Sequence, residues 1–130
     1  MMITTKGRNA LKIMIDLARH EGDGFISLAD VAERQKESLK YLEASTAQLS
    51  AAGLVVSARG KSGGYKLART PDKYTAAEIL RVGEGTLSPV QCLISGCENA
   101  VNCDTLPLFK ELDEVIMNFL SSKTLKDLIQ

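Results

Sequence analysis

The change in apolar spacing at Gly53 constrains the fold of this chain more than any other feature of its sequence. Before Gly53, apolar residues recur every three or four positions, which is the spacing of helices that bury one face. This spacing predicts helices over about 5–20, 27–34 and 38–52. Gly53 itself is suited to the left-handed conformation that ends a helix.

After Gly53 the pattern becomes that of a hairpin. Short strand candidates at 54–58 and 65–68 flank a basic, glycine-rich loop over 59–64. Three helices followed by two strands is the order of a winged helix-turn-helix. We therefore predict a mainly α fold with a small β wing.

The third predicted helix has one apolar face and one polar face. We expect Ser38 to cap it and a buried stripe to run along it at helical spacing, through Leu39, Leu42, Thr46 and Leu49. The outward residues are then Lys40, Tyr41, Glu43, Ala44, Ala47 and Gln48. Ser27 similarly caps the second helix in a predicted capping box.

The second half of the chain predicts two more helices around an irregular segment. Thr75-Ala76-Ala77-Glu78 is a capping box for a helix to about Val82, and 83–104 is irregular. A long final helix over about 105–120 carries a broad apolar face. This face packs either on its own domain or on a second copy, and we favour a dimerisation helix. We expect one compact domain with a DNA-binding region over 1–74 and a sensor and dimerisation region over 75–130.

Charge is divided unevenly between these regions. The whole chain has a net charge of zero, but residues 1–73 carry 12 Lys and Arg against 8 Asp and Glu, and 74–130 carry 4 against 8. A basic N-terminal region fits a polyanion partner, although a solvated surface can have the same composition.

The basic region suggests specific contacts with double-stranded DNA. Lys40 and Tyr41 are suited to holding phosphates in the major groove, and Glu43 to accepting a hydrogen bond from cytosine. Arg59, beside glycines in the wing, is suited to a narrow minor groove. A nucleotide-binding loop is the weaker interpretation, because 59–64 lacks the Gly-Lys-Ser/Thr ending and lies in a hairpin.

Cys92, Cys97 and Cys103 are three thiols within twelve residues. We expect a reducing cytosol, because no secretory signal or membrane span is evident, and there such cysteines indicate metal or redox chemistry. Thiolates suit iron–sulfur clusters or zinc, and free thiols remain an alternative. No catalytic constellation is evident, so we do not expect an enzyme.

Several segments together resemble the winged-helix regulators that include IscR, NsrR and CymR, and the resemblance spans nearly the whole chain. They are Thr5-Lys6-Gly7-Arg8, Lys40-Tyr41-Leu42-Glu43, Ala52-Gly53-Leu54-Val55, Arg59-Gly60, Gly63 to Arg69, the region of Gly85, Pro89-Val90-Gln91-Cys92-Leu93 and Thr124 to Leu128. One departure is Ser45-Thr46, where relatives usually have bulkier apolar residues, which implies looser helix packing.

The resemblance implies a homodimeric repressor that binds a DNA operator. The DNA contacts it suggests are Lys6, Ser38, Lys40, Tyr41, Glu43, Arg59, Lys61, Gly63 and Gly64. It also implies a two-iron or four-iron cluster on Cys92, Cys97 and Cys103, which purified protein can lack. The remaining ligand stays open among Asp104, Glu98, a residue of the partner subunit and a small molecule.

Two rival interpretations remain open at this stage. One is a clusterless regulator controlled by thiol oxidation or by a protein partner. The other is an iron–sulfur carrier whose basic face docks on an acidic protein.

Overall fold

The first half of the chain folds as three helices and a hairpin, in the predicted order. The computed structural model describes residues 3–130 and contains α1 (Thr5–Arg19), α2 (Leu28–Gln35), α3 (Leu39–Ala51), β1 (Val55–Ala58) and β2 (Gly64–Leu67). The predicted mainly α fold with a small β wing is confirmed, and Gly53 has the expected positive φ.

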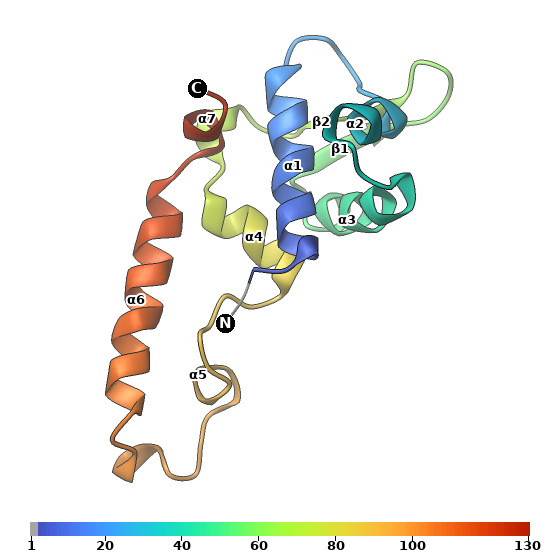
Figure 1. Cartoon of the computed structure of the whole chain (residues 1–130). Helices are drawn as coiled ribbons and strands as arrows, with labels where there is room; N and C mark the ends of the chain where they lie inside the picture. Colours follow the sequence, from blue (N-terminus) through green and yellow to red (C-terminus); the bar gives the residue numbers. More distant parts are fainter. Residues whose placement is uncertain (1–2) are drawn as a thin grey trace.

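Helix α1 lies at the centre of the fold and packs on both α3 and α4 (Figure 1). Its buried face joins apolar side chains from α2, α3 and β1 in one core, in which Ile13, Met14, Leu42 and Leu49 are fully buried. The crossing of α1 with α4 is close because glycines meet there. A Cβ on Gly83 would lie 2.8 Å from the Cα of Gly7.

The buried face of α3 differs from the predicted one at its start. Leu42, Thr46 and Leu49 are buried as expected, but Leu39 is 42% exposed and the prediction for it was wrong. Ser45 is buried instead, because positions 42, 45, 46 and 49 share the side of the helix that meets α1.

The predicted caps are correct in part. Ser27 and Thr75 each accept a hydrogen bond from the third helical N–H, so they cap α2 and α4. Ser38 takes the predicted cap position of α3, but its side chain makes no capping hydrogen bond. The Glu78 carboxylate pairs with Arg69 and does not complete the predicted capping box with Thr75.

The wing is a two-stranded antiparallel hairpin in which Val55 pairs with Leu67 and Ala58 with Gly64. Tyr65 also exchanges two 2.8 Å backbone hydrogen bonds with Ile26, which ties the wing to the segment before α2. A Cβ on Gly64 would lie 2.1 Å from the Ile26 carbonyl oxygen, and the φ of Gly64 is +148°. Only glycine fits this approach.

The second half contains more short elements than expected. After the 3-10 turn η1 (Pro71–Lys73) come α4 (Ala76–Glu84), α5 (Cys92–Ser95), η2 (Ala100–Asn102), α6 (Leu106–Ser122) and α7 (Leu125–Leu128). The sequence did not predict α7, which begins with a complete capping box between Thr124 and Asp127. Fully buried Leu125 anchors α7 to the body.

Helix α6 stands apart from the winged helix (Figure 1). It contacts α4 along one side, and its C-terminal end returns to the body through α7. Its N-terminal end joins the segment that carries the cysteines. No helix within residues 3–130 has the length and apolar character needed to cross a membrane.

Candidate DNA interface and cysteine segment

The start of α3 presents the predicted contact residues to solvent. Ser38, Lys40, Tyr41 and Glu43 are all exposed, and the Tyr41 side chain is 64% exposed. Because the capping bond of Ser38 is not formed, its hydroxyl is available to a partner. The helix therefore offers a hydroxyl, an ammonium, a phenol and a carboxylate at one end, a set that suits phosphates and base edges together.

Lys6 lies in the first turn of α1, beside α3, and is exposed. It lines the same groove as Tyr41 and Gln48 of α3. The structure therefore places Lys6 and Tyr41, far apart in sequence, on neighbouring parts of one surface.

Arg59 and Lys61 are exposed on the loop of the wing, which projects from the body beyond α2 and α3 (Figure 1). Gly63 and Gly64 are partly covered, and their close backbone contacts account for them without a partner. A Cβ on Gly63 would lie 2.3 Å from the Ala58 carbonyl oxygen. Their role is to shape the turn that presents Arg59.

A partly buried ion pair joins α2 to α1. The Asp16 carboxylate of α1, 2% exposed, accepts hydrogen bonds from Arg34 Nε at 2.9 Å and from a terminal guanidinium nitrogen at 2.7 Å. Burial opposes ionisation of Asp16, but the hydrogen bonds from Arg34 and Gln35 outweigh it and lower its pKa. Sequence patterning did not identify this pair, because its members are 18 residues apart.

The cysteines lie on the connection between α4 and α6. Cys92 begins α5, Cys97 is exposed after it, and Cys103 precedes α6. Burial raises the pKa of the Cys92 thiol, and the neighbouring thiols of Cys97 and Cys103 raise it further. The pKa of Cys103 is lowered by hydrogen bonds from the Thr105 hydroxyl, 3.2 Å away, and from backbone N–H groups at the start of α6.

The three cysteines are suitable ligands for a thiolate-bound metal group, but they leave one ligand position to be filled by another donor. All three thiols lie on the one connection between α4 and α6, within twelve residues of the sequence. Over residues 3–130, however, no three His, Cys, Asp or Glu side chains converge closely enough to hold a metal ion as they stand. Glu98 and Asp104 are exposed on the same segment.

Glu84 connects the end of α4 to the start of α1. Its carboxylate accepts hydrogen bonds from the Thr4 N–H and hydroxyl, both 2.7 Å, and from the Gly7 N–H at 2.9 Å. Burial raises the pKa of Glu84, but these donors and the charge of Lys6 outweigh it, and the pKa is lowered. No sequence signal identified this link, which joins residues about eighty positions apart.

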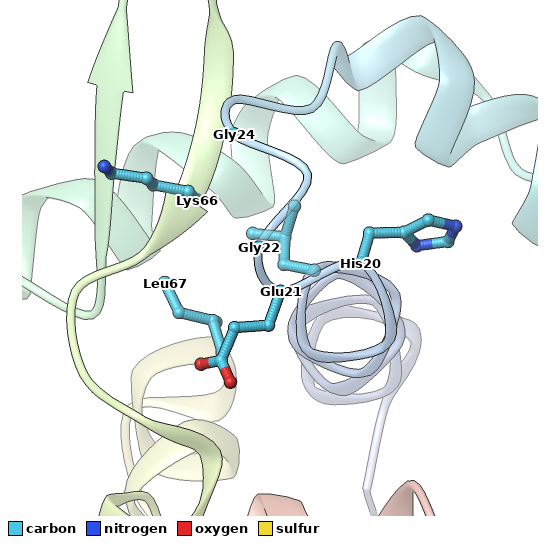
Figure 2. Close-up of a pocket in the computed structure, with 7 residues that line it drawn as sticks. His20, Glu21, Gly22, Gly24, Lys66 and Leu67 are labelled. Atoms are coloured by element: carbon cyan, nitrogen blue, oxygen red, sulfur yellow. The ribbon is translucent and has the colours of Figure 1, made fainter.

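His20 is remote from the cysteines, at the end of α1. It borders a pocket of about 350 Å³ between the following turn and β2 (Figure 2). Its Nδ1 lies 2.8 Å from the Asp16 carbonyl oxygen, and Figure 2 shows its ring directed away from Lys66. Lys66 Nζ instead lies 4.7 Å from the centroid of the Phe25 ring. The polar groups here do not converge, so we assign no site to this pocket.

Comparison with known proteins points to one kind of protein. Residues 3–130 match the family model described as Rrf2, an iron-dependent transcriptional regulator. The HTH-type transcriptional regulator IscR of Xenorhabdus nematophila is 38% identical over 131 residues, which cover 100% of this chain and 80% of that protein.

Solved structures agree with the sequence match. The structure of CymR, the global cysteine regulator of B. subtilis, is 42% identical with a TM-score of 0.83, covering 99% of this chain and 96% of that one. T. potens IscR is 39% identical with a TM-score of 0.80, covering 99% of this chain and 86% of that one.

Proposed function

This chain belongs to the Rrf2 family of transcriptional regulators, and from that premise we propose that it is a homodimeric repressor that senses through its cysteines. Its relatives are transcription regulators and not enzymes. A role on chromosomal DNA places it in the cytoplasm. The observation that carries the DNA-binding part is the exposed set of Ser38, Lys40, Tyr41 and Glu43 at the start of α3, beside the basic wing.

In this proposal α3 enters the major groove and the wing reaches the flanking backbone or minor groove. Lys40, Tyr41, Lys6 and Lys61 hold phosphates, which fixes the register of α3 but carries no sequence information. Glu43 selects bases, because a carboxylate repels phosphates and accepts only from donors such as the cytosine amino group. Arg59 provides the cation at the tip of the wing.

Dimerisation through α6 is part of the proposal. Leu108, Leu112, Val115 and Phe119 are 62%, 41%, 63% and 58% exposed, and they form one stripe at i, i+4, i+7 and i+11. A second copy is the occupant that we propose for this stripe. Two copies related by a two-fold axis would present two α3 helices, which suits a pseudo-palindromic operator.

Cys92, Cys97 and Cys103 are the residues that we propose hold an iron–sulfur cluster. A cluster held there would supply iron that responds to oxidants and to nitric oxide. The coupling between a cluster and the DNA-binding surface would run through contacts within the chain. The connection that carries the cysteines begins at Gly85, next to Glu84, and reaches Cys92 eight positions after Glu84, so a displacement that extends back to Glu84 would reach Thr4, Gly7 and the adjacent Lys6.

Purification without oxygen, followed by iron, zinc and acid-labile sulfide assays and an absorption spectrum, tests the sensor. We expect a brown protein with iron and sulfide that are absent from a triple Cys→Ala variant. Zinc without iron or sulfide would contradict the cluster.

A second candidate is a clusterless regulator controlled by thiol oxidation or by a protein partner. The observation that favours it is the 42% identity to CymR, a regulator described by its role in cysteine control rather than by iron. Protein free of iron and sulfide, whose DNA affinity still changes on thiol oxidation or on addition of a cellular partner, would support this candidate.

A further inference from the structure

A groove between α1 and α3 is bordered by Asn9, whose buried side-chain oxygen the fold leaves without a hydrogen-bond partner. The groove has a volume of about 560 Å³ and is bordered by Thr5, Lys6 and Asn9 on one side and by Tyr41, Ser45 and Gln48 on the other. Asn9 is 3% exposed. Its side-chain oxygen is the one buried side-chain polar atom of residues 3–130 without a hydrogen-bond partner.

Such an acceptor is unusual in a folded protein, because buried polar groups almost always find a partner. The α3 side of the groove is shaped by small residues: Ser45 is 5% exposed, and its side chain leaves room that a larger apolar residue would fill. The volume lies within the range of roughly 300–1,000 Å³ that is usual for small-molecule sites.

The bordering groups define the chemistry of an occupant. The Asn9 oxygen requires a hydrogen-bond donor. Lys6 borders the groove, is exposed and attracts an anion, and the hydrogen bonds of the nearby Glu84 carboxylate go to Thr4 and Gly7. The Tyr41 ring supplies an apolar wall. DNA phosphates have only acceptors, so the DNA backbone alone does not satisfy Asn9.

We propose that the α1–α3 groove binds a small hydroxy- or amino-carboxylate, which donates to Asn9 and pairs its carboxylate with Lys6. This ligand is an input separate from the cysteines. Its regulatory effect rests on the proposed function: because Lys6 and Tyr41 are also proposed DNA contacts, ligand and operator compete for them. Occupancy of the groove therefore weakens DNA binding.

Amide chemical shifts of the ¹⁵N-labelled full chain test the site directly. The probes are L-malate, L-lactate and L-alanine, with succinate and propionate as matched acids that lack the donor. We expect saturable shifts at residues 5, 6, 9, 41, 45 and 48 with the donor-bearing acids and much weaker shifts with the matched acids. Absence of saturable shifts there, or equal shifts with succinate and L-malate, overturns the proposal.

Substitutions inside and outside the groove test whether the chemical shifts arise from binding in the groove. Asn9→Leu removes the acceptor and Ser45→Leu fills the groove from α3, so each should abolish the shifts, while Asn118→Leu on α6 should leave them unchanged. If circular dichroism shows that Asn9→Leu does not fold, the Ser45→Leu variant and the comparison of L-malate with succinate test the site instead. Retained L-malate binding in a folded Ser45→Leu protein contradicts the site.

Competition with DNA tests the regulatory part. For a duplex selected from a random pool, the apparent Kd should rise in proportion to L-malate and not to succinate. If no duplex is bound specifically, the proposed function fails while the groove still stands on its chemical shifts. If DNA binds normally and no acid shifts the groove amides, only this inference fails.

Discussion

Arg59 is the residue that we expect to contribute most directly to DNA affinity, because it is an exposed cation at the start of the wing loop. We expect Arg59→Ala to weaken operator binding by about 1–3 kcal/mol and to lower the salt slope by about one, since one contact to the duplex is lost. Titration at several salt concentrations measures both quantities. Arg81→Ala, which removes an exposed arginine of α4 beside α6, is the control and should change neither. Unchanged affinity and slope for Arg59→Ala would exclude it from the interface.

We propose that Glu43 contributes to specificity rather than to affinity, because a carboxylate near phosphates lowers affinity and selects for base donors. We expect Glu43→Ala to broaden the set of bound sequences while the affinity for the preferred site changes little. Selection from a random DNA pool with both proteins makes the comparison. Identical preferred sites would remove Glu43 from base recognition.

At the scale of elements, the pair of Asp16 and Arg34 holds α2 against α1 and thereby orients the helix-turn-helix. Arg34→Met leaves a buried carboxylate without its main donor, which should lower the free energy of unfolding by about 1–3 kcal/mol. Urea unfolding at pH 7 measures it. Arg69→Met, which breaks the more exposed pair with Glu78, is the matched control. Loss of this ion pair should lower the free energy of unfolding by less than Arg34→Met does.

The same pair has a defined pH dependence. The folded pKa of Asp16 is lowered, so its contribution is full above the usual value of 3.8 and is lost as pH falls below that value toward the folded pKa. Wild-type stability should therefore decline in this acidic window more steeply than that of Arg34→Met. Parallel acid profiles would show that Arg34 does not lower the pKa of Asp16.

Elements with a long, regular pattern were predictable from the sequence, and those fixed by distant contacts were not. The helical spacing of α1 and the glycine-rich break of the wing are local signals. Leu39 was misplaced because the side of α3 that meets α1 passes through Ser45, a polar residue that carries no hydrophobic signal. Helix α7 is four residues long and is held by Leu125 in the core, which local patterning does not reveal.

At the scale of the molecule, the same distinction applies to the candidate site. The exposed residues of α3 and the cysteine spacing could be predicted from the sequence. The link from Glu84 to Thr4 and Gly7, the unpaired Asn9 and the proximity of Lys6 to Tyr41 depend on how α1 packs against α3 and α4. Nothing in the spacing of these residues encodes that packing.

The apolar stripe of α6 predicts the oligomeric state of the whole molecule. Val115→Glu places a charge at the centre of Leu108, Leu112 and Phe119, so we expect a monomer in sedimentation experiments and weaker operator binding. Lys110→Glu, on the opposite side of α6, is the matched control and should leave the dimer intact. A Val115→Glu protein that remains dimeric would place the interface elsewhere.

Single Cys→Ala changes at positions 92, 97 and 103 test where the molecule gets its stability. The core is built from helices α1 to α4, β1 and the Leu125 anchor, and none of the three cysteines is fully buried. We therefore expect each variant to lose iron, to keep its fold with little change in Tm, and to change in operator affinity or site preference. A structural zinc behaves differently, because its binding free energy is also folding free energy.

Iron content and thermal stability, measured on the same preparations, separate these cases. If each variant loses iron and melts close to wild type, the cysteine segment is a sensor attached to an independently stable fold. If zinc is present and each variant melts far below wild type, the segment is a structural metal site. If the triple variant contains no metal and regulates normally in cells, sensing does not depend on the cysteines. Control by a protein partner and the groove beside Asn9 then remain as the proposed inputs, and a ligand in the groove would act on Lys6 and Tyr41 without passing through Glu84.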